Sequence, residues 1–232
     1  MGTRKVYGRR SLRLPRLILS LVAPPVFLDV DNTLLDNDAA KAALEARIAA
    51  AVDERAARRF WELYDIVRRD EDYVDFPATI ERLRAEAPAE ADRVARILDE
   101  LPYGGFVYPG VLAMIERLWG SFTPAILSDG DGVFQRRKIE RAGLSAAVGG
   151  NVFVYVHKEQ HLDELTRRFP GRPVFVDDKR PILGHIERQL PDAITVHVRQ
   201  GSYAGEPVDS GDPPPDLEIE RIADLDGALG RR

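Results

Sequence analysis

The sequence predicts an α/β fold built on a doubly wound parallel sheet, with a helical segment inserted near its start. Short apolar runs rich in β-branched and aromatic residues alternate with amphipathic stretches along most of the chain. The runs are apolar at consecutive positions, as expected for strands that are buried on both faces of a parallel sheet. Residues 39–101 break this alternation, because they are dense in Ala, Arg, Glu and Leu and contain no strand pattern.

Six segments have the length and composition of strands. They are residues 26–30, 124–128, 151–156, 173–177 and 193–198, followed by a shorter run at 217–219. Helical patterns separate the later strands, at residues 111–119, 133–142, 160–169 and 181–189. Strands that alternate with helices in this way are typical of a doubly wound sheet.

The segment between the first two strands is expected to form a helical cap domain. Amphipathic helical spacing is present at residues 42–60 and 88–101, and Gly104 and Gly105 close the segment. A chain of 232 residues is long enough for a core domain with a smaller inserted one. The expected domains are a core of residues 26–37 and 106–232 and a helical cap of residues 38–105.

Composition excludes several kinds of protein. The chain has no cysteine, which rules out disulfides, thiolate metal sites and cysteine nucleophiles, and which fits a reducing compartment. Residues 1–28 hold six basic residues and no acidic one, so the remainder carries 27 basic against 38 acidic residues. A body this acidic does not favour nucleic-acid binding. No apolar run is long enough to span a membrane, so we expect neither a nucleic-acid nor a membrane partner.

Residues 1–25 form a basic extension ahead of the first strand. Arg9 and Arg10 precede an apolar run at residues 17–23, which gives the segment a faint similarity to an export signal. The run is at the short limit for such a signal, and Pro24 and Pro25 lead directly into the first strand. We therefore expect a disordered extension on a cytoplasmic protein, with export or organelle targeting as the alternative.

Reactive side chains follow four of the predicted strands, at or just beyond the point where each strand ends. They are Asp29 and Asp31, Ser128, Lys158, and the pair Asp177 and Asp178. In open α/β sheets the ligand crevice lies outside the carboxyl ends of the strands. Each residue alone could be a turn, capping or surface residue. Because four strands place such residues at the same edge of the sheet, a functional site is favoured there.

These residues resemble the motifs of the haloacid dehalogenase (HAD) superfamily of hydrolases. Residues 27–35, Phe-Leu-Asp-Val-Asp-Asn-Thr-Leu-Leu, are similar to its first motif almost letter for letter. Ser128 is similar to the second motif, Lys158 to the third, and Asp177 with Asp178 to the acidic fourth. The helical segment resembles the cap of the C1 subclass. The resemblance implies a Rossmannoid core and phosphatase-like chemistry.

The resemblance also implies roles for these residues. It assigns catalysis to Asp29, Asp31, Ser128 and Lys158, substrate contacts to Thr33, Ser128, Asp129 and Lys158, and Mg²⁺ binding to Asp29, Asp31, Asp177 and Asp178. Asp31 would bind the metal through its backbone carbonyl. Dehalogenase relatives lack the second carboxylate of the first motif, because a departing halide needs no proton. Asp31 therefore favours phosphoester chemistry.

The chemistry of the residues points the same way. Asp29 and Asp31 are two positions apart on an extended segment, so their side chains tend to share a face. One carboxylate can attack phosphorus while the other protonates the leaving oxygen and then deprotonates water. Four carboxylates would repel a phosphate dianion, and a hard divalent cation such as Mg²⁺ removes that repulsion.

The function expected from the sequence is the Mg²⁺-dependent hydrolysis of a small-molecule phosphomonoester through an aspartyl-phosphate. A phosphomutase or phosphotransferase would use the same residues and differ in the acceptor. A HAD-like domain that serves as a binding or regulatory module, with little catalysis, is an alternative of a different class. The intact acid pairs argue against that module.

Other charged and aromatic residues have lesser expected roles. Lys138 lies in a run that reads as a charged, solvated helix face, so Lys158 is preferred as the active-site lysine. Asp129 and Asp131 add negative charge beside Ser128, which Lys179 and Arg180 could offset. The histidines, at 157, 161, 185 and 197, lack metal-binding spacing. In the cap, Phe60, Trp61, Tyr64, Tyr73 and Phe76 are expected to form a small core, with Arg68 and Arg69 as hypothetical contacts to a second phosphate or carboxylate.

Overall fold

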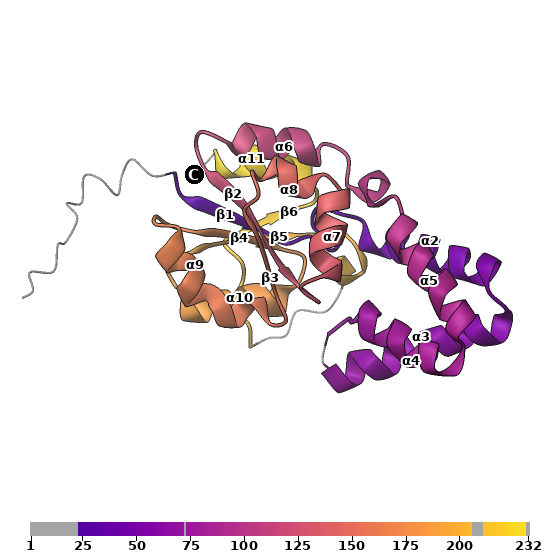
Figure 1. The fold of residues 1–232 in the computed structure, drawn as a ribbon. Coiled ribbons are helices and arrows are strands. Elements are labelled where there is room, and N and C mark those ends of the chain that lie inside the picture. The colour runs from indigo at the N-terminus through magenta and orange to yellow at the C-terminus, as the bar shows by residue number, and fades with distance from the viewer. Residues whose placement is uncertain (1–22, 72, 206–210, 231–232) are drawn as a thin grey trace, which may run out of the picture.

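The computed structural model describes residues 23–71, 73–205 and 211–230. Within them a six-stranded parallel sheet has the order β3-β2-β1-β4-β5-β6 (Figure 1). The strands are β1 Pro25–Leu28, β2 Thr123–Asp129, β3 Val152–Tyr155, β4 Val174–Asp177, β5 Ile194–Val198 and β6 Leu217–Ile219. The predicted α/β fold is confirmed. The predictions for the basic extension concern a segment of which residues 1–22 lie outside the described part of the chain.

The strands are apolar on both faces because helices cover both faces of the sheet. Phe27 of β1 lies opposite Ala125 of β2 and Phe175 of β4 in the parallel register. These residues belong to one hydrophobic cluster, in which the rings of Phe27 and Phe175 stack with 5.0 Å between their centroids. The alternate residues Val26 and Leu28 face the other cluster. This two-sided burial explains the absence of a polar alternation.

Six core helices flank the sheet. They are α6 Val111–Leu118, α7 Phe134–Arg141, α8 Leu144–Ala147, α9 Leu162–Arg168, α10 Arg180–Gln189 and α11 Leu225–Leu229. Helices α9 and α10 lie on one face, and α6, α8 and α11 on the other (Figure 1). The short helices α8 and α11 were not anticipated. Gly143, with a φ of 75°, separates α7 from α8 in a backbone conformation that favours glycine.

Four helices form the insert between β1 and β2. They are α2 Asn37–Ala51, α3 Glu54–Glu71, α4 Phe76–Glu86 and α5 Pro88–Glu100. The helix expected over residues 42–60 is wrong as a single element, because the chain breaks at Val52 and Asp53. The Asp53 carboxylate accepts a hydrogen bond from the Ala56 amide (2.8 Å) and so caps the start of α3.

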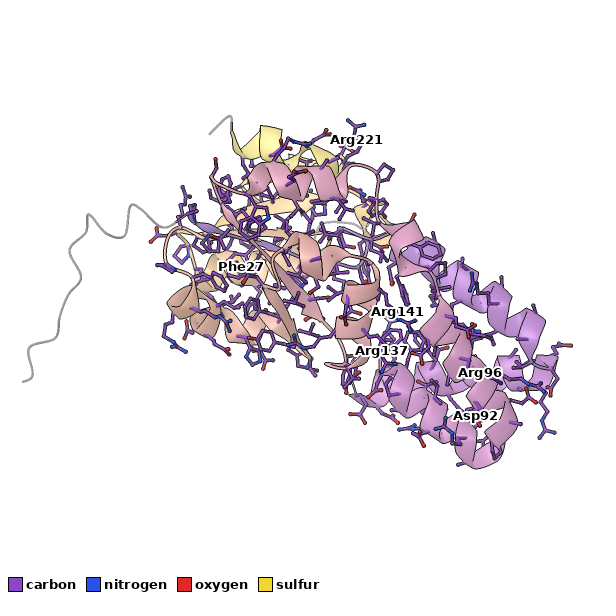
Figure 2. The ribbon with its side chains drawn as sticks, turned by 45° about the horizontal axis from the view of Figure 1, so that its top comes forward. Phe27, Asp92, Arg96, Arg137, Arg141 and Arg221 are labelled. Carbon is purple, nitrogen blue, oxygen red and sulfur yellow. The ribbon has the colours of Figure 1, made fainter. Side chains whose placement is uncertain are left out.

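The two connections between insert and core run side by side. The Asp36 amide donates to the Phe106 carbonyl (2.8 Å), and the Tyr108 amide donates to the Leu34 carbonyl (3.0 Å). Leu35 and Val107 form an antiparallel bridge between these bonds. These backbone contacts join the insert to the core through a short two-stranded ribbon. Further out, Arg137 of α7 reaches the insert and pairs with Asp99 of α5 (2.6 Å; Figure 2).

Among the described residues, no helix has the length and apolar character needed to cross a membrane.

Candidate active site

The carboxyl edge of the sheet brings the predicted site residues together. Asp29 directly follows β1, and its amide donates to the carbonyl of Val176 in β4 (3.0 Å). Ser128 and Asp129 end β2, and Asp177 ends β4. Lys158 begins the 3-10 helix η2, Lys158–His161, which follows β3. In the strand order these strands are neighbours around β1, where the order reverses and a crevice forms.

A cavity of about 290 Å³ lies over this edge, between core and insert. Asp29, Asp31, Ser128 and Asp129 line its core side. Lys158, Asp177 and Asp178 do not line the cavity and are nearly fully buried. They therefore form a layer of charge that is closed to solvent.

Lys158 is the central cation of that layer. Its Nζ donates to Asp29 Oδ1 (2.5 Å) and to Asp177 Oδ2 (2.7 Å). Burial alone would lower its pKa, but Asp177 and Asp29 outweigh burial and hold the pKa of Lys158 well above the usual range. The side chain is therefore an ammonium group that offsets the charge of two carboxylates. Taken alone, this lysine could have been a surface residue, because most lysines lie in solvent.

Three buried carboxylates offer a place for a metal ion. Oxygens of Asp29, Asp177 and Asp178 lie within 4.8 Å of one another. Neither carboxylate oxygen of Asp178 has a hydrogen-bond partner in the described part of the chain. A buried, unpartnered carboxylate is costly, and a hard divalent cation such as Mg²⁺ prefers oxygen ligands of this kind. The residues present therefore fit Mg²⁺.

The electrostatics of the three carboxylates agree with that fit. Burial raises the pKa of Asp178 to about 9, and the charges of Asp177 and Asp29 add to the rise. Burial likewise raises the pKa of Asp29 to about 7, against the opposing effect of Lys158. A bound divalent cation would favour the ionised forms of both groups. No histidine belongs to this cluster, which is the metal-capable group found among the described residues.

The side chain of Asp31 is not part of this cluster and contacts α7. Its Oδ1 pairs with Lys138 Nζ, and its Oδ2 accepts a hydrogen bond from Gln135 Nε2 (3.2 Å). Lys138 Nζ also donates to Asn37 Oδ1 (2.7 Å). The resemblance implied only the backbone carbonyl of Asp31 as a metal ligand, and the carboxylate is thus free for another role.

The expectation that Lys138 lies on a solvated helix face is wrong. Gln135, Lys138 and Ile139 are buried and share one face of α7, whereas Arg136 and Arg137 between them are exposed. Positions i, i+3 and i+4 of a helix lie on the same side. That spacing was present in the sequence, but the surrounding basic residues obscured it. Gln135 and Asn37 were not anticipated as site residues.

Ser128 and the two aspartates after it have distinct contacts. Ser128 Oγ accepts a hydrogen bond from Gln135 Nε2 (2.9 Å). Asp129 Oδ1 accepts a hydrogen bond from the backbone amide of Lys158 (2.9 Å). This bond ties Asp129 to the segment that follows β3. Asp131 caps the start of α7 by accepting from the Phe134 amide (2.6 Å). The charge of Asp131 is thereby matched with a helix N-terminus.

Thr33 lies apart from the other predicted contacts. It is fully buried, its Oγ1 has no hydrogen-bond partner among the described residues, and it does not line the cavity. The preceding Asn32 has a φ of 61° and turns the chain. Asn32 Oδ1 accepts from the Asn37 amide (3.0 Å), which fixes the start of α2. The first motif therefore also builds the junction with the insert.

The insert side of the cavity differs in charge from the core side. It presents the exposed cations Lys41 and Arg68 beside Tyr64, Tyr73 and Phe76. Lys41 Nζ lies 5.2 Å from the centroid of the Tyr64 ring. Arg69 does not line the cavity, and its Nε donates to the Asp65 carbonyl (3.2 Å). Of the two arginines singled out in the sequence, Arg68 alone faces this space.

An acidic cluster at the carboxyl edge of a doubly wound sheet, with a cavity roofed by a helical insert, defines an α/β protein with an enclosed, enzyme-like site. Comparisons with known proteins identify the family. The chain is similar to a haloacid dehalogenase-like hydrolase of Burkholderia xenovorans LB400, with 38% identity over 90% of this chain and 98% of the other and a TM-score of 0.82. The chain belongs to the haloacid dehalogenase-like hydrolases.

More distant solved structures share the fold. The HAD-hydrolase YfnB of Bacillus subtilis, solved with bound magnesium, is 16% identical, with a TM-score of 0.62 over 90% of this chain and 99% of the other. L-2-haloacid dehalogenase of Xanthobacter autotrophicus, with chloropropionic acid covalently bound, is 18% identical, with a TM-score of 0.59 over the same shares of the two chains. No protein-family model and no curated protein sequence matches the chain.

Proposed function

We propose that this hydrolase cleaves a small-molecule phosphomonoester with Mg²⁺ through an aspartyl-phosphate on Asp29. The observation that carries the proposal is the second carboxylate, Asp31, which lines the same cavity as Asp29 and contacts Lys138 and Gln135 of α7. An alkoxide leaving group needs a proton donor, whereas a halide does not. The cavity thus supplies a proton carrier that dehalogenation would leave unused.

The proposed reaction has two steps. Asp29 attacks phosphorus, the bond to the ester oxygen breaks, and Asp31, which enters this step as the carboxylic acid, gives that oxygen its proton. Asp31 then takes a proton from water, which attacks the same phosphorus and releases phosphate and the Asp29 carboxylate. Lys158 offsets negative charge on Asp29 and the phosphoryl oxygens, and Ser128 donates a hydrogen bond to those oxygens.

Asp29, Asp177 and Asp178 would hold Mg²⁺. When bound, the ion supplies the positive charge that lets a phosphate dianion approach this acidic site. The charges of Lys158 and of the nearby Lys179 do not balance three carboxylates and a phosphate dianion.

The insert side of the cavity supports a substrate with a second anionic group. Lys41 and Arg68 have no ion pair with another described residue, and both line the cavity opposite the carboxylates. A phosphate or carboxylate on the leaving part of the substrate would pair with them. The neighbouring tyrosine and phenylalanine rings would cover an apolar portion.

A substrate panel tests the proposal. Phosphate release is measured with sugar phosphates, nucleotides and phosphorylated acids, with and without a second anionic group, and chloride release is measured with 2-chloro acids. We expect phosphate release that EDTA suppresses and Mg²⁺ restores. Chloride release without phosphate release would instead identify a dehalogenase. Phosphate transfer to an added sugar in place of water would identify a phosphotransferase.

The nucleophile is tested by Asp29→Asn. The amide cannot form the aspartyl-phosphate, so we expect phosphate release to fall by at least roughly 10³-fold while the circular dichroism spectrum is unchanged. Asp131→Asn is a matched control, because Asp131 lies in the same cavity wall but caps α7. Near-normal turnover by Asp29→Asn would exclude Asp29 as the nucleophile.

A further inference from the structure

The carboxylate of Asp31 is held by two side chains from one face of α7. Lys138 binds Oδ1, and Gln135 donates to Oδ2 (3.2 Å). The two residues are three positions apart, which places them side by side on the helix. Each oxygen of the carboxylate therefore has its own partner, and rotation of the group would break both contacts.

The two partners are themselves fixed by the surrounding elements. Gln135 Nε2 also donates to Ser128 Oγ at the end of β2 (2.9 Å). Lys138 Nζ also donates to Asn37 Oδ1 at the start of α2 (2.7 Å). The positions of both donors are thus set by the sheet and by the junction with the insert.

Burial differs between the carboxylate and its partners. The side chain of Lys138 is 5% exposed, whereas that of Asp31 is 35% exposed. All three side chains, those of Asp31, Lys138 and Gln135, line the cavity, and Asp31 is more exposed than Lys138. This is the arrangement expected for a group that must meet a substrate in one orientation.

The burial of Lys138 also calls for a reason. Lysine is rarely buried, because its ammonium group loses hydration unless a partner compensates. Helix α7 carries other basic residues that remain in solvent, Arg136, Arg137 and Arg141. Lys138 is the basic residue of this helix that turns inward, and its partners there are Asp31 and Asn37.

We propose that Lys138 and Gln135 are positioning residues that hold the Asp31 side chain in place, so that its carboxylic acid form can give a proton to the leaving oxygen of the substrate. The inference rests on the proposed phosphomonoester hydrolysis. Asp31 follows the strand and lies outside the regular sheet, so without these contacts its side chain can adopt other rotamers. A displacement of about 1 Å at a reacting group can lower a rate by roughly 10²-fold.

This role has a specific kinetic signature. Loss of a correctly placed proton donor slows departure of a basic alkoxide but has little effect on p-nitrophenolate, which leaves without a proton. The quantity to measure is kcat/KM, which covers the steps up to departure of the leaving group. A lysine that served only the fold, or that only bound phosphate, would change kcat/KM for both esters by the same factor.

The experiment compares p-nitrophenyl phosphate with the alkyl phosphomonoester that the wild-type protein cleaves fastest. For Lys138→Met we expect kcat/KM to fall by roughly 10- to 100-fold on the alkyl ester and by less than about 3-fold on the aryl ester. Asp31→Asn should show the same selectivity to a larger degree. Arg141→Met removes an exposed cation from the same helix and should leave the ratio of the two values unchanged.

Asn37→Ala provides a second test of the positioning role if Lys138→Met does not fold. Asn37 contacts Lys138 and not Asp31, so its loss should shift the ratio in the same direction by a smaller factor. Equal effects on both esters in the folded variants would overturn the positioning role. Absence of phosphate release by the wild-type protein from every ester would instead refute the proposed function itself.

Discussion

Lys158 and Lys138 are both buried lysines that pair with an aspartate of the first motif, but their surroundings differ. Lys158 lies among Asp29, Asp177 and Asp129, beneath the cavity floor. Lys138 contacts one carboxylate and one amide at the cavity wall. The first arrangement suits charge stabilisation at the proposed reacting centre, and the second suits the positioning of one side chain.

That difference leads to a prediction for Lys158→Met. We expect kcat/KM to fall by roughly 10²- to 10³-fold for every phosphomonoester, whatever its leaving group, because the cation that offsets the phosphoryl charge is lost. Initial rates on the same aryl and alkyl esters test this, with Arg141→Met as the control. A loss confined to the alkyl ester would show that the roles of the two lysines are exchanged.

At the residue scale, the sequence located the proposed reacting groups better than the side chains that contact them. Asp29, Ser128 and the pair Asp177 and Asp178 could be found because each ends or follows an apolar strand. The contacts of Lys138 could not be found in the same way, because they depend on how α7 is rotated against the sheet. Helical spacing gives the relative positions of side chains but not the direction in which the shared face points.

At the scale of elements, the strands were predicted well and the helix boundaries less well. The strands of a buried parallel sheet appear in the sequence as continuous apolar runs, so all six strands of this sheet could be predicted. Helices α8 and α11 have four and five residues, too few for a periodic pattern. The break between α2 and α3 depends on a single capping side chain within a long helix-forming stretch.

That capping residue gives a prediction about stability. Asp53→Ala removes the side chain that accepts from the Ala56 amide, so the free energy of unfolding should fall by about 1 kcal/mol. Urea unfolding followed by circular dichroism measures the change. Asp65→Ala, at an exposed position inside α3, is the matched control and should change stability by less than about 0.5 kcal/mol. Equal effects of the two substitutions would mean that the cap contributes nothing.

At the scale of the whole molecule, the buried acids link folding to pH and to metal binding. The pKa of Asp29 is raised to about 7 and that of Asp178 to about 9, from an ordinary value of 3.8. Below that ordinary value both groups are protonated in the folded and the unfolded chain. At higher pH the folded chain binds more protons than the unfolded one, so its stability falls as pH rises through the raised pKa values.

We therefore expect the metal-free protein to lose stability as pH rises from about 5 to about 9. Mg²⁺ should reduce this loss, because it binds the ionised carboxylates of the folded state. Thermal unfolding across this pH range, in EDTA and in Mg²⁺, measures both effects. The control Asp178→Asn removes one of the two titrating groups and should flatten the pH dependence in EDTA. A melting temperature that rises with pH in EDTA would contradict the assignment.

The paired connections at Leu34–Asp36 and Phe106–Tyr108 have a consequence for how this protein can diversify. The two connections are hydrogen-bonded to each other. The whole insert is therefore attached to the core at one place, as the loop of a hairpin is attached to its two strands. Exchange of the insert for another with the same spacing at its base leaves the register of β1 and β2 untouched. The half of the cavity that carries Lys41 and Arg68 can thus evolve, or be grafted, independently of the half that carries Asp29.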